Sequence, residues 1–254
     1  MNAHGISVTG KVRANNEDAL FHSDTAFFCL PNIYIVADGM GGHKSGEVAS
    51  AKAIEFFFER CKYGALNGEI LDFLVESVTY ANKRVYEMSC LDESLYGMGT
   101  TFTACSYSAD KLYIAHIGDS RIYSVAAGRI KQLTTDHTYV GEMIRAGQLT
   151  EEEARHHRAR NMLMRALGSE RVCVIDGYVA SFDTAKILLC SDGLNGMITD
   201  DEILKAFEIN TDNAVIADAL VGKALDAGGL DNITVIVFDI NPSFNEPNGG
   251  GTNS

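Results

Sequence analysis

Apolar residues recur at helical spacing in two long segments of the chain, 45–61 and 69–91, so each segment is expected to form a helix. Shorter helices are expected at 200–208 and 212–227. Most other apolar residues occur in short runs rich in β-branched and aromatic side chains, a composition that predicts strands. The predicted strands cover residues 7–16, 27–36, 100–107, 112–117, 120–125, 129–133, 172–179, 185–190 and 232–240.

The order of these elements predicts the fold class. Strands between residues 100 and 133 are joined by turns at 108–110 and 126–128, which is typical of an antiparallel meander. Helices come in pairs and do not alternate singly with strands, so a regular βαβ repeat is excluded. We therefore expect an α+β protein in which antiparallel sheets are covered by helices. A chain of 254 residues without a repeat or a linker suits one domain.

Two segments are expected to depart from this core. Residues 136–161 are polar and charged, contain Gly141 and Gly147, and are predicted to form short helical pieces that stand off the sheet. The end of the chain, 241–254, holds two prolines and three consecutive glycines, and a disordered tail is expected there.

Four of the predicted strands have an aspartate at one edge, namely Asp38, Asp119, Asp192 and Asp231. The apolar runs draw the strands into one core, so the strand ends can gather at one rim. Carboxylates crowded at that rim would repel one another unless cations were bound among them. A site for a hard metal ion, assembled from distant parts of the chain, is the simplest interpretation.

The glycine-rich segment 37–43 extends this interpretation. Asp38 closes a strand, and its carboxylate and the Gly39 carbonyl are both suitable oxygen ligands for Mg²⁺ or Mn²⁺. A plain glycine turn is the alternative for this segment alone. A Walker phosphate loop is excluded, because His43 stands where that motif requires its last glycine.

An early polar stretch adds further candidates. Glu17 and Asp18 are two more carboxylates, and Arg13 lies just before them. A guanidinium is a natural fork for phosphate oxygens, although a single arginine is more often a surface ion-pair residue.

Composition and charge exclude several classes of protein. The formal net charge is −13, from 34 acidic and 21 basic residues, so binding to a nucleic acid, which needs a basic face, is not expected. No apolar run approaches the ~20 residues that span a membrane, and the first ten residues lack the apolar core of a signal peptide. Six cysteines without a CxxC pair argue against a thiolate zinc site. Most of them lie in apolar contexts typical of buried free thiols, and together with the missing signal peptide and membrane span they favour a reducing cytoplasm. Without an apolar stripe or a heptad pattern, a monomer is expected.

Eight segments, in order from residue 13 to residue 234, resemble the bacterial members of the type 2C, metal-dependent Ser/Thr protein phosphatase family. The matching segments are 13–19, 36–43, 99–101, 116–121, 133–137, 165–168, 191–194 and 231–234. The resemblance implies a β-sandwich of two antiparallel sheets flanked by helices. It places a catalytic domain at 1–241, a flap beside the cleft at about 136–161, and a tail at 242–254.

The resemblance also implies a centre of two metal ions, Mn²⁺ or Mg²⁺, and in bacterial members a third. Asp38 would bridge two ions, and the Gly39 carbonyl would bind one of them. Asp192 and Asp231 would hold the other.

Further roles follow from the same resemblance. Glu17 and Asp18 would act through coordinated water, and Asp119 would form the third site together with Asp192. Arg13 would bind the substrate phosphate.

One position departs from the animal members, which have a histidine directly after the Asp-Gly pair as a proposed general acid. Here that position is Met40, and His43 follows three residues later, as is usual in bacterial members. We hypothesise that His43 contacts the substrate or assists protonation of the leaving group. A role in helix entry is an equally good interpretation.

The function implied is hydrolysis of phosphoserine and phosphothreonine in proteins, by attack of a metal-bridging hydroxide, in opposition to a bacterial Ser/Thr kinase. A catalytically silent scaffold is disfavoured, because Arg13 and the full set of aspartates are present. A structural Ca²⁺ domain would have no need of Arg13, and no Asp-x-Asp-x-Asp loop is present. A hydrolase of small phosphoesters or nucleotides stays open, because its metal centre would be the same.

Overall fold

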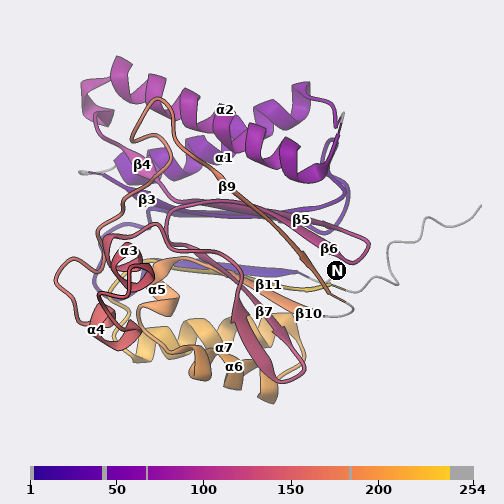
Figure 1. Cartoon of the computed structure of the whole chain (residues 1–254), viewed down its shortest axis with the longest axis vertical. Coiled ribbons are helices and arrows are strands. Elements are labelled where there is room, and N and C mark those ends of the chain that lie inside the picture. The colour runs from indigo at the N-terminus through magenta and orange to yellow at the C-terminus, as the bar shows by residue number, and fades with distance from the viewer. Residues whose placement is uncertain (1–2, 42–44, 67, 183–184, 241–254) are drawn as a thin grey trace, which may run out of the picture.

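The computed structural model describes residues 3–41, 45–66, 68–182 and 185–240. They form two antiparallel sheets packed face to face (Figure 1). The first sheet has the strand order β1 (His4–Val8), β11 (Ile233–Ile240), β10 (Ala185–Cys190), β7 (Arg121–Ala126), β8 (Arg129–Gln132). The second has the order β2 (Asp18–Ser23), β3 (Ile33–Met40), β5 (Phe102–Ser108), β6 (Lys111–Ile117), β9 (Asp176–Ser181), with β4 (Gly99–Thr100) paired to the end of β3.

Helices cover the outer face of each sheet, as the α+β class requires. Helices α1 (Ser45–Tyr63) and α2 (Ile70–Leu91) lie on the second sheet, and α6 (Asp200–Ile209) and α7 (Asn213–Asp226) lie on the first (Figure 1). Short helices η1 (Glu93–Leu95), α3 (Tyr139–Arg145), α4 (Glu151–Arg155) and α5 (Asp192–Asn195) complete the described elements. Among them, no helix is long and apolar enough to cross a membrane.

The central strands are apolar on both faces because both faces are covered. In β3, Ile33 and Ile35 pack in the cluster with α1 and α2, whereas Tyr34 points into the layer between the sheets. In that layer the ring of Tyr34 stacks on Phe238 of β11, with ring centroids 3.7 Å apart and an interplanar angle of 6°. Two-sided burial explains why these strands read as unbroken apolar runs and not as alternating ones.

The expected fold class and the four longer helices are confirmed, but the first strands are not where the pattern placed them. Strand β1 ends at Val8, and residues 9–17 form a connection, so the expected strand 7–16 is wrong over most of its length. The polar stretch that follows contains β2, an edge strand whose side chains are all half-buried and therefore give a weak pattern.

Two other strands begin later than expected. The strand expected at 27–36 begins only at Ile33, after Pro31, and Phe27 makes an isolated bridge with Leu30. The strand expected at 172–179 is β9, Asp176–Ser181. His43 and the tail expected at 242–254 lie outside the described residues.

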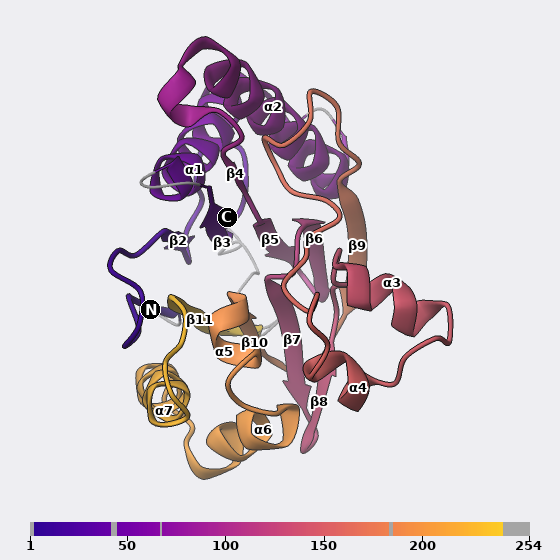
Figure 2. The same ribbon diagram turned by 90° about the vertical axis from the view of Figure 1, so that its left-hand side faces the viewer.

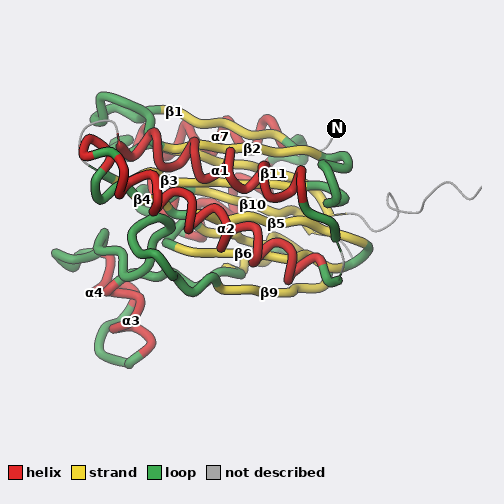
Figure 3. Tube along the Cα trace, turned by 90° about the horizontal axis from the view of Figure 1, so that it is seen from above, coloured by secondary structure: helices red, strands yellow, loops and turns green. Residues whose placement is uncertain are grey.

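Helices α3 and α4 stand off the sheets at one end of the sandwich, where short helical pieces were expected (Figure 3). The segment leaves and rejoins the core through a bridge between Thr138 and Leu163. We call residues 138–163 the flap. Thr138 also caps α3 by accepting the backbone N–H of Gly141 at 3.0 Å, so the departure point is fixed by its own side chain.

The stack between the sheets gives a prediction about stability. Phe238→Ala is expected to lower the free energy of unfolding by about 3–5 kcal/mol, because Phe238 is fully buried and its removal leaves a cavity between Tyr34 and the strands beside it. Urea denaturation followed by circular dichroism measures the change. Leu91→Ala is the control, since Leu91 is 88% exposed, and an equal loss in both variants would contradict this account of the core.

Candidate metal centre

Asp18 and Asp38 face each other across the β2–β3 pair, where their Cα atoms are partners in the register. Like charges directly opposite in an antiparallel pair repel. The backbone of Asp38 is nevertheless fixed by its neighbours. Its N–H donates to the Thr101 hydroxyl at 2.8 Å, and its carbonyl accepts from the Thr101 N–H at 2.8 Å and from the Thr100 hydroxyl at 2.9 Å.

Gly39 follows Asp38 because the start of α1 approaches it closely. A Cβ at position 39 would lie 2.0 Å from the Gly46 carbonyl oxygen, so only glycine fits. The Gly39 N–H donates to the Glu17 carbonyl at 3.1 Å, which joins the connection before β2 to the end of β3.

The other sheet supplies Asp192 and Asp231 from neighbouring strands. Asp192 opens α5, two residues after β10, and Asp231 lies two residues before β11. The two segments are joined because the Ser191 N–H donates to the Thr234 carbonyl at 3.0 Å. Helix α5 lies at the same end of the sandwich as the flap (Figure 2), and residues of both line one cleft.

Asn232 ties this edge to the connection before β2. Its side-chain carbonyl accepts the Glu17 N–H at 2.8 Å, and its amide donates to the carbonyls of Thr9 and Asn15 at 3.0 and 2.9 Å. The position of Glu17 therefore depends on a residue 215 positions later in the chain.

Asp119 follows β6 in a turn that only glycine can make easily. Gly118 has a φ of +111°, and a Cβ there would lie 2.6 Å from the side chain of Thr101. The turn buries Asp119 to 8% exposure. The hydroxyls of Thr101 and Ser120 are 2.7 Å apart, so Thr101, which accepts the N–H of Asp38, also contacts the residue after Asp119.

The electrostatics show that these carboxylates lie together. Burial raises the pKa of Asp38 well above its ordinary value, and the charges of Asp18, Asp192, Asp119 and Asp231 raise it further. Burial and the charge of Asp231 raise the pKa of Asp192 to about 6, although a hydrogen bond with Asp38 opposes the shift. The pKa of Asp119 is also raised well above its ordinary value, by burial and then by Asp192.

Asp18 has one oxygen satisfied and one without a partner. Its Oδ2 accepts from the hydroxyls of Ser191 at 2.7 Å and Thr234 at 2.6 Å. Its Oδ1 is buried and has no hydrogen-bond partner among the described residues. Burial raises the pKa of Asp18 to about 7, the two hydroxyls lower it, and the charges of Asp192 and Asp231 raise it. A proton, a water molecule or a cation would satisfy Oδ1.

This donor set fits a hydrated divalent cation. Within the described residues, no group of three or more His, Cys, Asp or Glu side chains is arranged to hold a metal ion directly. Mg²⁺ usually keeps several waters and takes only one or two carboxylates from the protein. Crowded aspartates with raised pKa values and an unpaired carboxylate oxygen match that mode of binding better than a closed cage of protein ligands.

Arg13 lies at the rim of the centre. One of its Nη atoms donates to Asp231 Oδ2 at 2.7 Å, and its side chain is 51% exposed. This hydrogen bond is the main cause that raises the pKa of Arg13, against the effect of burial. An exposed pair of this kind contributes only about 0–1 kcal/mol, so the guanidinium can change partners at little cost.

The sequence pattern therefore identified the acidic residues that meet here but missed their supports. Thr101, Ser191, Asn232 and Thr234 all stand in motif segments, yet no role was predicted for them. The available signal was a hydroxyl or amide side chain within a few positions of each aspartate. Their function is to donate to carboxylates or to hold the backbone beside them.

A cleft of about 710 Å³ runs from this centre to the flap. It is lined both by Asp119 and Asp192 and by three flap arginines, Arg145, Arg155 and Arg160. An acidic end and a basic wall within one cleft suit a ligand that carries negative charge next to a bound cation.

Comparison with known proteins assigns the fold to a family. The family model for protein phosphatase 2C matches residues 11–219. The chain belongs to the protein phosphatase 2C family. The serine/threonine phosphatase stp of Listeria welshimeri is 36% identical over 247 residues, which cover 95% of this chain and 96% of that protein.

Solved structures agree. The serine/threonine phosphatase Stp1 from Staphylococcus aureus has a TM-score of 0.88 at 30% identity, over 95% of this chain and 96% of that chain. The catalytic domain of the serine/threonine protein phosphatase PstP, in complex with two manganese ions, has a TM-score of 0.82 at 34% identity. The match covers 94% of this chain and 98% of that chain. The chain is accordingly a serine/threonine protein phosphatase of a metal-dependent family, which acts on phosphoproteins.

The raised pKa of Asp18 gives a prediction for the metal-free protein. Because the folded-state pKa of about 7 lies above the unfolded value near 3.8, the ionised carboxylate costs stability above pH 7, and the cost disappears as the pH falls toward 4. Asp18→Asn keeps an acceptor for Ser191 and Thr234 and removes the charge. It is expected to increase the free energy of unfolding at pH 8 by at most about 4 kcal/mol, with a smaller gain at each lower pH.

Chemical denaturation with chelator present, at intervals from pH 8 to pH 5, measures this gain. Subtracting the wild-type curve removes the titration of all other groups. A gain that is constant with pH, or that grows on acidification, would show that Asp18 is not the group that carries the cost.

Proposed function

We propose that this phosphatase hydrolyses phosphoserine and phosphothreonine at the cluster of aspartates around Asp38, with two ions of Mn²⁺ or Mg²⁺ and in some conditions a third. The observation that carries the proposal is the convergence of aspartates from both sheets on one edge, with Oδ1 of Asp18 buried and unpaired. The PstP catalytic domain with two manganese ions supports the metal count by similarity.

Each residue of the cluster has a proposed place. Asp38 would bridge two ions, with the Gly39 carbonyl on one of them, and Asp192 and Asp231 would hold the other. Asp18, whose Oδ2 is already taken by two hydroxyls, would act through water.

Two further carboxylates complete the donor set. Glu17 would also act through water, and the third site would lie between Asp119 and Asp192. When bound, divalent cations lower the pKa of water and so supply a nucleophile near neutral pH.

The substrate phosphate would be oriented by Arg13, which lies beside Asp231 and is exposed enough to turn toward a ligand. The arginines of the flap, Arg145, Arg155 and Arg160, would contact the phosphoprotein around the phosphorylated residue, because they line the same cleft. His43 is proposed as a residue that contacts the substrate or assists the leaving group.

A partner kinase, a location and an oligomeric state are also proposed. A Ser/Thr phosphatase needs a kinase that makes its substrate, so a separate Ser/Thr kinase is its proposed counterpart. All six cysteines are free thiols, which supports the cytoplasm as its location. A monomer is also proposed, because the sequence has no apolar stripe or heptad pattern. Light scattering after gel filtration measures the mass.

The function is tested by removing metal and then returning it. Protein stripped by a chelator is expected to release no phosphate from a phosphothreonine peptide, and Mn²⁺ is expected to restore hydrolysis. Asp38→Asn is expected to lower kcat by about 10²–10³-fold, because the variant loses the charge that would bridge the ions.

Phosphate release measured on the peptide and on a nucleotide at equal concentration separates a protein phosphatase from a hydrolase of small phosphoesters. Full activity of the metal-free protein, or of Asp38→Asn, would refute the proposed centre.

Arg13 is tested by a pair of variants. Arg13→Ala is expected to lower kcat/KM for the peptide by about 10–100-fold, since a charge-assisted hydrogen bond to phosphate is lost. Arg13→Lys keeps the charge but not the forked guanidinium, so its kcat/KM should lie between those of Arg13→Ala and the wild type. The Mn²⁺ concentration for half-maximal activity is measured in parallel. A change in that concentration without a change in KM would mean that Arg13 acts on the metal through Asp231 and not on the substrate.

A further inference from the structure

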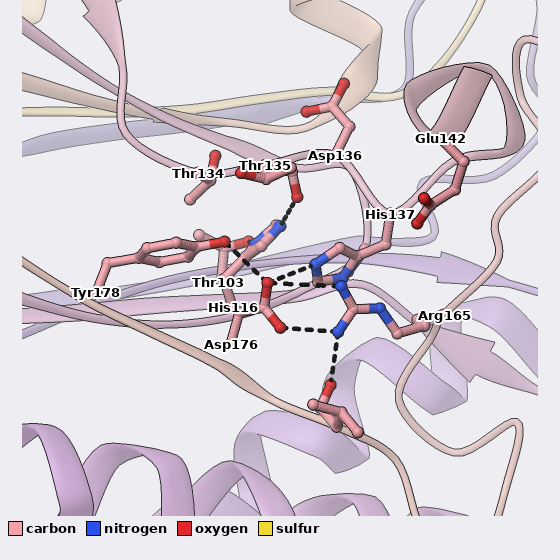
Figure 4. Close-up of polar contacts among 12 residues, drawn as sticks. Thr103, His116, Thr134, Thr135, Asp136, His137, Glu142, Arg165, Asp176 and Tyr178 are labelled. Carbon is pink, nitrogen blue, oxygen red and sulfur yellow. Dashed lines mark hydrogen bonds and ion pairs between the residues drawn. The ribbon is translucent and has the colours of Figure 1, made fainter. Parts of the chain in front are cut away.

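A polar network at the base of the flap contains none of the residues proposed to hold metal ions. His137, the residue before the flap, is fully buried, and its ring lies against that of His116 with centroids 4.8 Å apart (Figure 4). A buried, hydrogen-bonded histidine on a chain segment that leaves the core calls for a structural or a mechanistic reason.

His137 is bound to the turn that carries Asp119. The backbone N–H of His137 donates to the Gly118 carbonyl at 2.8 Å, and the Gly118 N–H donates to His137 Nδ1 at 3.1 Å. Because Gly118 supplies the proton, Nδ1 is the acceptor and Nε2 carries the ring N–H. Burial and then the charge of Arg165 lower the pKa of His137, which agrees with a neutral ring.

The other ring nitrogen reaches Asp176, at the start of β9. His137 Nε2 donates to Asp176 Oδ2 at 3.1 Å, and Arg165 donates to Oδ1 at 2.7 Å (Figure 4). The Tyr178 hydroxyl donates to Oδ2 at 2.9 Å. Burial raises the pKa of Asp176, but the donors, first Arg165, then Tyr178 and His137, outweigh it and lower the pKa to about 2.

Two of the three partners of Asp176, His137 and Arg165, lie on the two chain segments of the flap neck. The neck is the bridge between Thr138 and Leu163 together with its flanking hydrogen bonds. The Met164 N–H donates to the His137 carbonyl at 2.7 Å, and Arg165 follows at once. The carboxylate of Asp176, in the second sheet, thus holds the outgoing segment through His137 and the returning segment through Arg165.

We propose that His137, Asp176 and Arg165 form a clamp that fixes the flap neck against the Gly118–Asp119 turn, and that His137 is a positioning residue for the reaction. The ring has two separable functions. Its Nδ1 side orients the turn that presents Asp119 to the metal centre, and its Nε2 side holds the flap that lines the substrate cleft. The inference rests on the proposed function, because it gives Asp119 a place in the metal centre.

Two substitutions at one position separate these contacts. His137→Asn keeps an oxygen near the Nδ1 position for the Gly118 N–H but is too short to reach Asp176. His137→Gln keeps an amide N–H that can reach Asp176 but has no acceptor at the Nδ1 position. Asp176→Asn is the second route to a loosened flap, should either variant fail to fold. Tyr178→Phe is the matched control, since it removes one donor to Asp176 and leaves the neck untouched.

Amide hydrogen exchange in metal-free protein is the first measurement. His137→Gln is expected to speed exchange at Gly118 by about tenfold and to leave Met164 unchanged, because one hydrogen bond is lost at the turn. His137→Asn is expected to speed exchange at Met164 and to leave Gly118 unchanged. Amides in the centre of β11, such as that of Ile236, should exchange at the wild-type rate in both variants. Faster exchange there, or the same pattern in both variants, would overturn the clamp.

Kinetics with Mn²⁺ then test its part in the reaction. For His137→Asn we expect KM for a phosphopeptide to rise about tenfold, with hydrolysis of p-nitrophenyl phosphate almost unchanged. For His137→Gln we expect the Mn²⁺ concentration for half-maximal activity to rise about tenfold instead. Equal losses of kcat in both variants, with KM and the metal requirement unchanged, would overturn the positioning role. If the wild type hydrolyses nothing with any metal, the proposed function fails, while the exchange data still decide the clamp.

Discussion

The rest of the structure depends on one electrostatic constraint, the crowding of aspartates at one edge of a β-sandwich. Asp18 and Asp38 are placed opposite each other by strand register, and Asp192 is brought to them by the neighbouring sheet. Such a cluster is unfavourable without cations. The cost is offset by a core with three buried layers, in which strands β3 and β11 contribute apolar side chains to both faces. The sandwich must be rigid because the aspartates at its edge repel one another.

Sequence patterns predicted the fold where burial is complete and failed where it is partial. The long helices and the central strands were found because helical spacing and unbroken apolar runs are strong signals. Strand β2 was missed because it lies at an edge and its side chains are all half-buried. The segment 9–17 was mistaken for a strand because its course is set by Asn232, which lies more than 200 residues away and holds it by three hydrogen bonds. No local pattern can contain that information.

The same division applies to the site. Aspartates at the ends of apolar runs are visible in the sequence, because a charged residue beside a buried strand is unusual. The hydroxyls of Ser191 and Thr234 are not visible, because serine and threonine are common and only the fold shows that both donate to Asp18. His137 was likewise read as part of a polar segment. Its hydrogen-bond partners are Gly118, directly after β6, and Asp176 of β9, and β6 and β9 are neighbours only in the folded sheet.

Two aspartates of this protein show how a structure distinguishes a structural carboxylate from one suited to a cation. Asp18 and Asp176 are both half-buried, and burial raises the pKa of each. Asp176 receives hydrogen bonds from a guanidinium, a phenol and an imidazole, and its pKa falls to about 2. Asp18 receives only two neutral hydroxyls and lies among other aspartates, and its pKa rises to about 7. The first carboxylate has its positive partner within the chain and therefore serves to hold the flap. The second has none among the described residues, so a proton, a water molecule or a cation from solution must satisfy its unpaired oxygen.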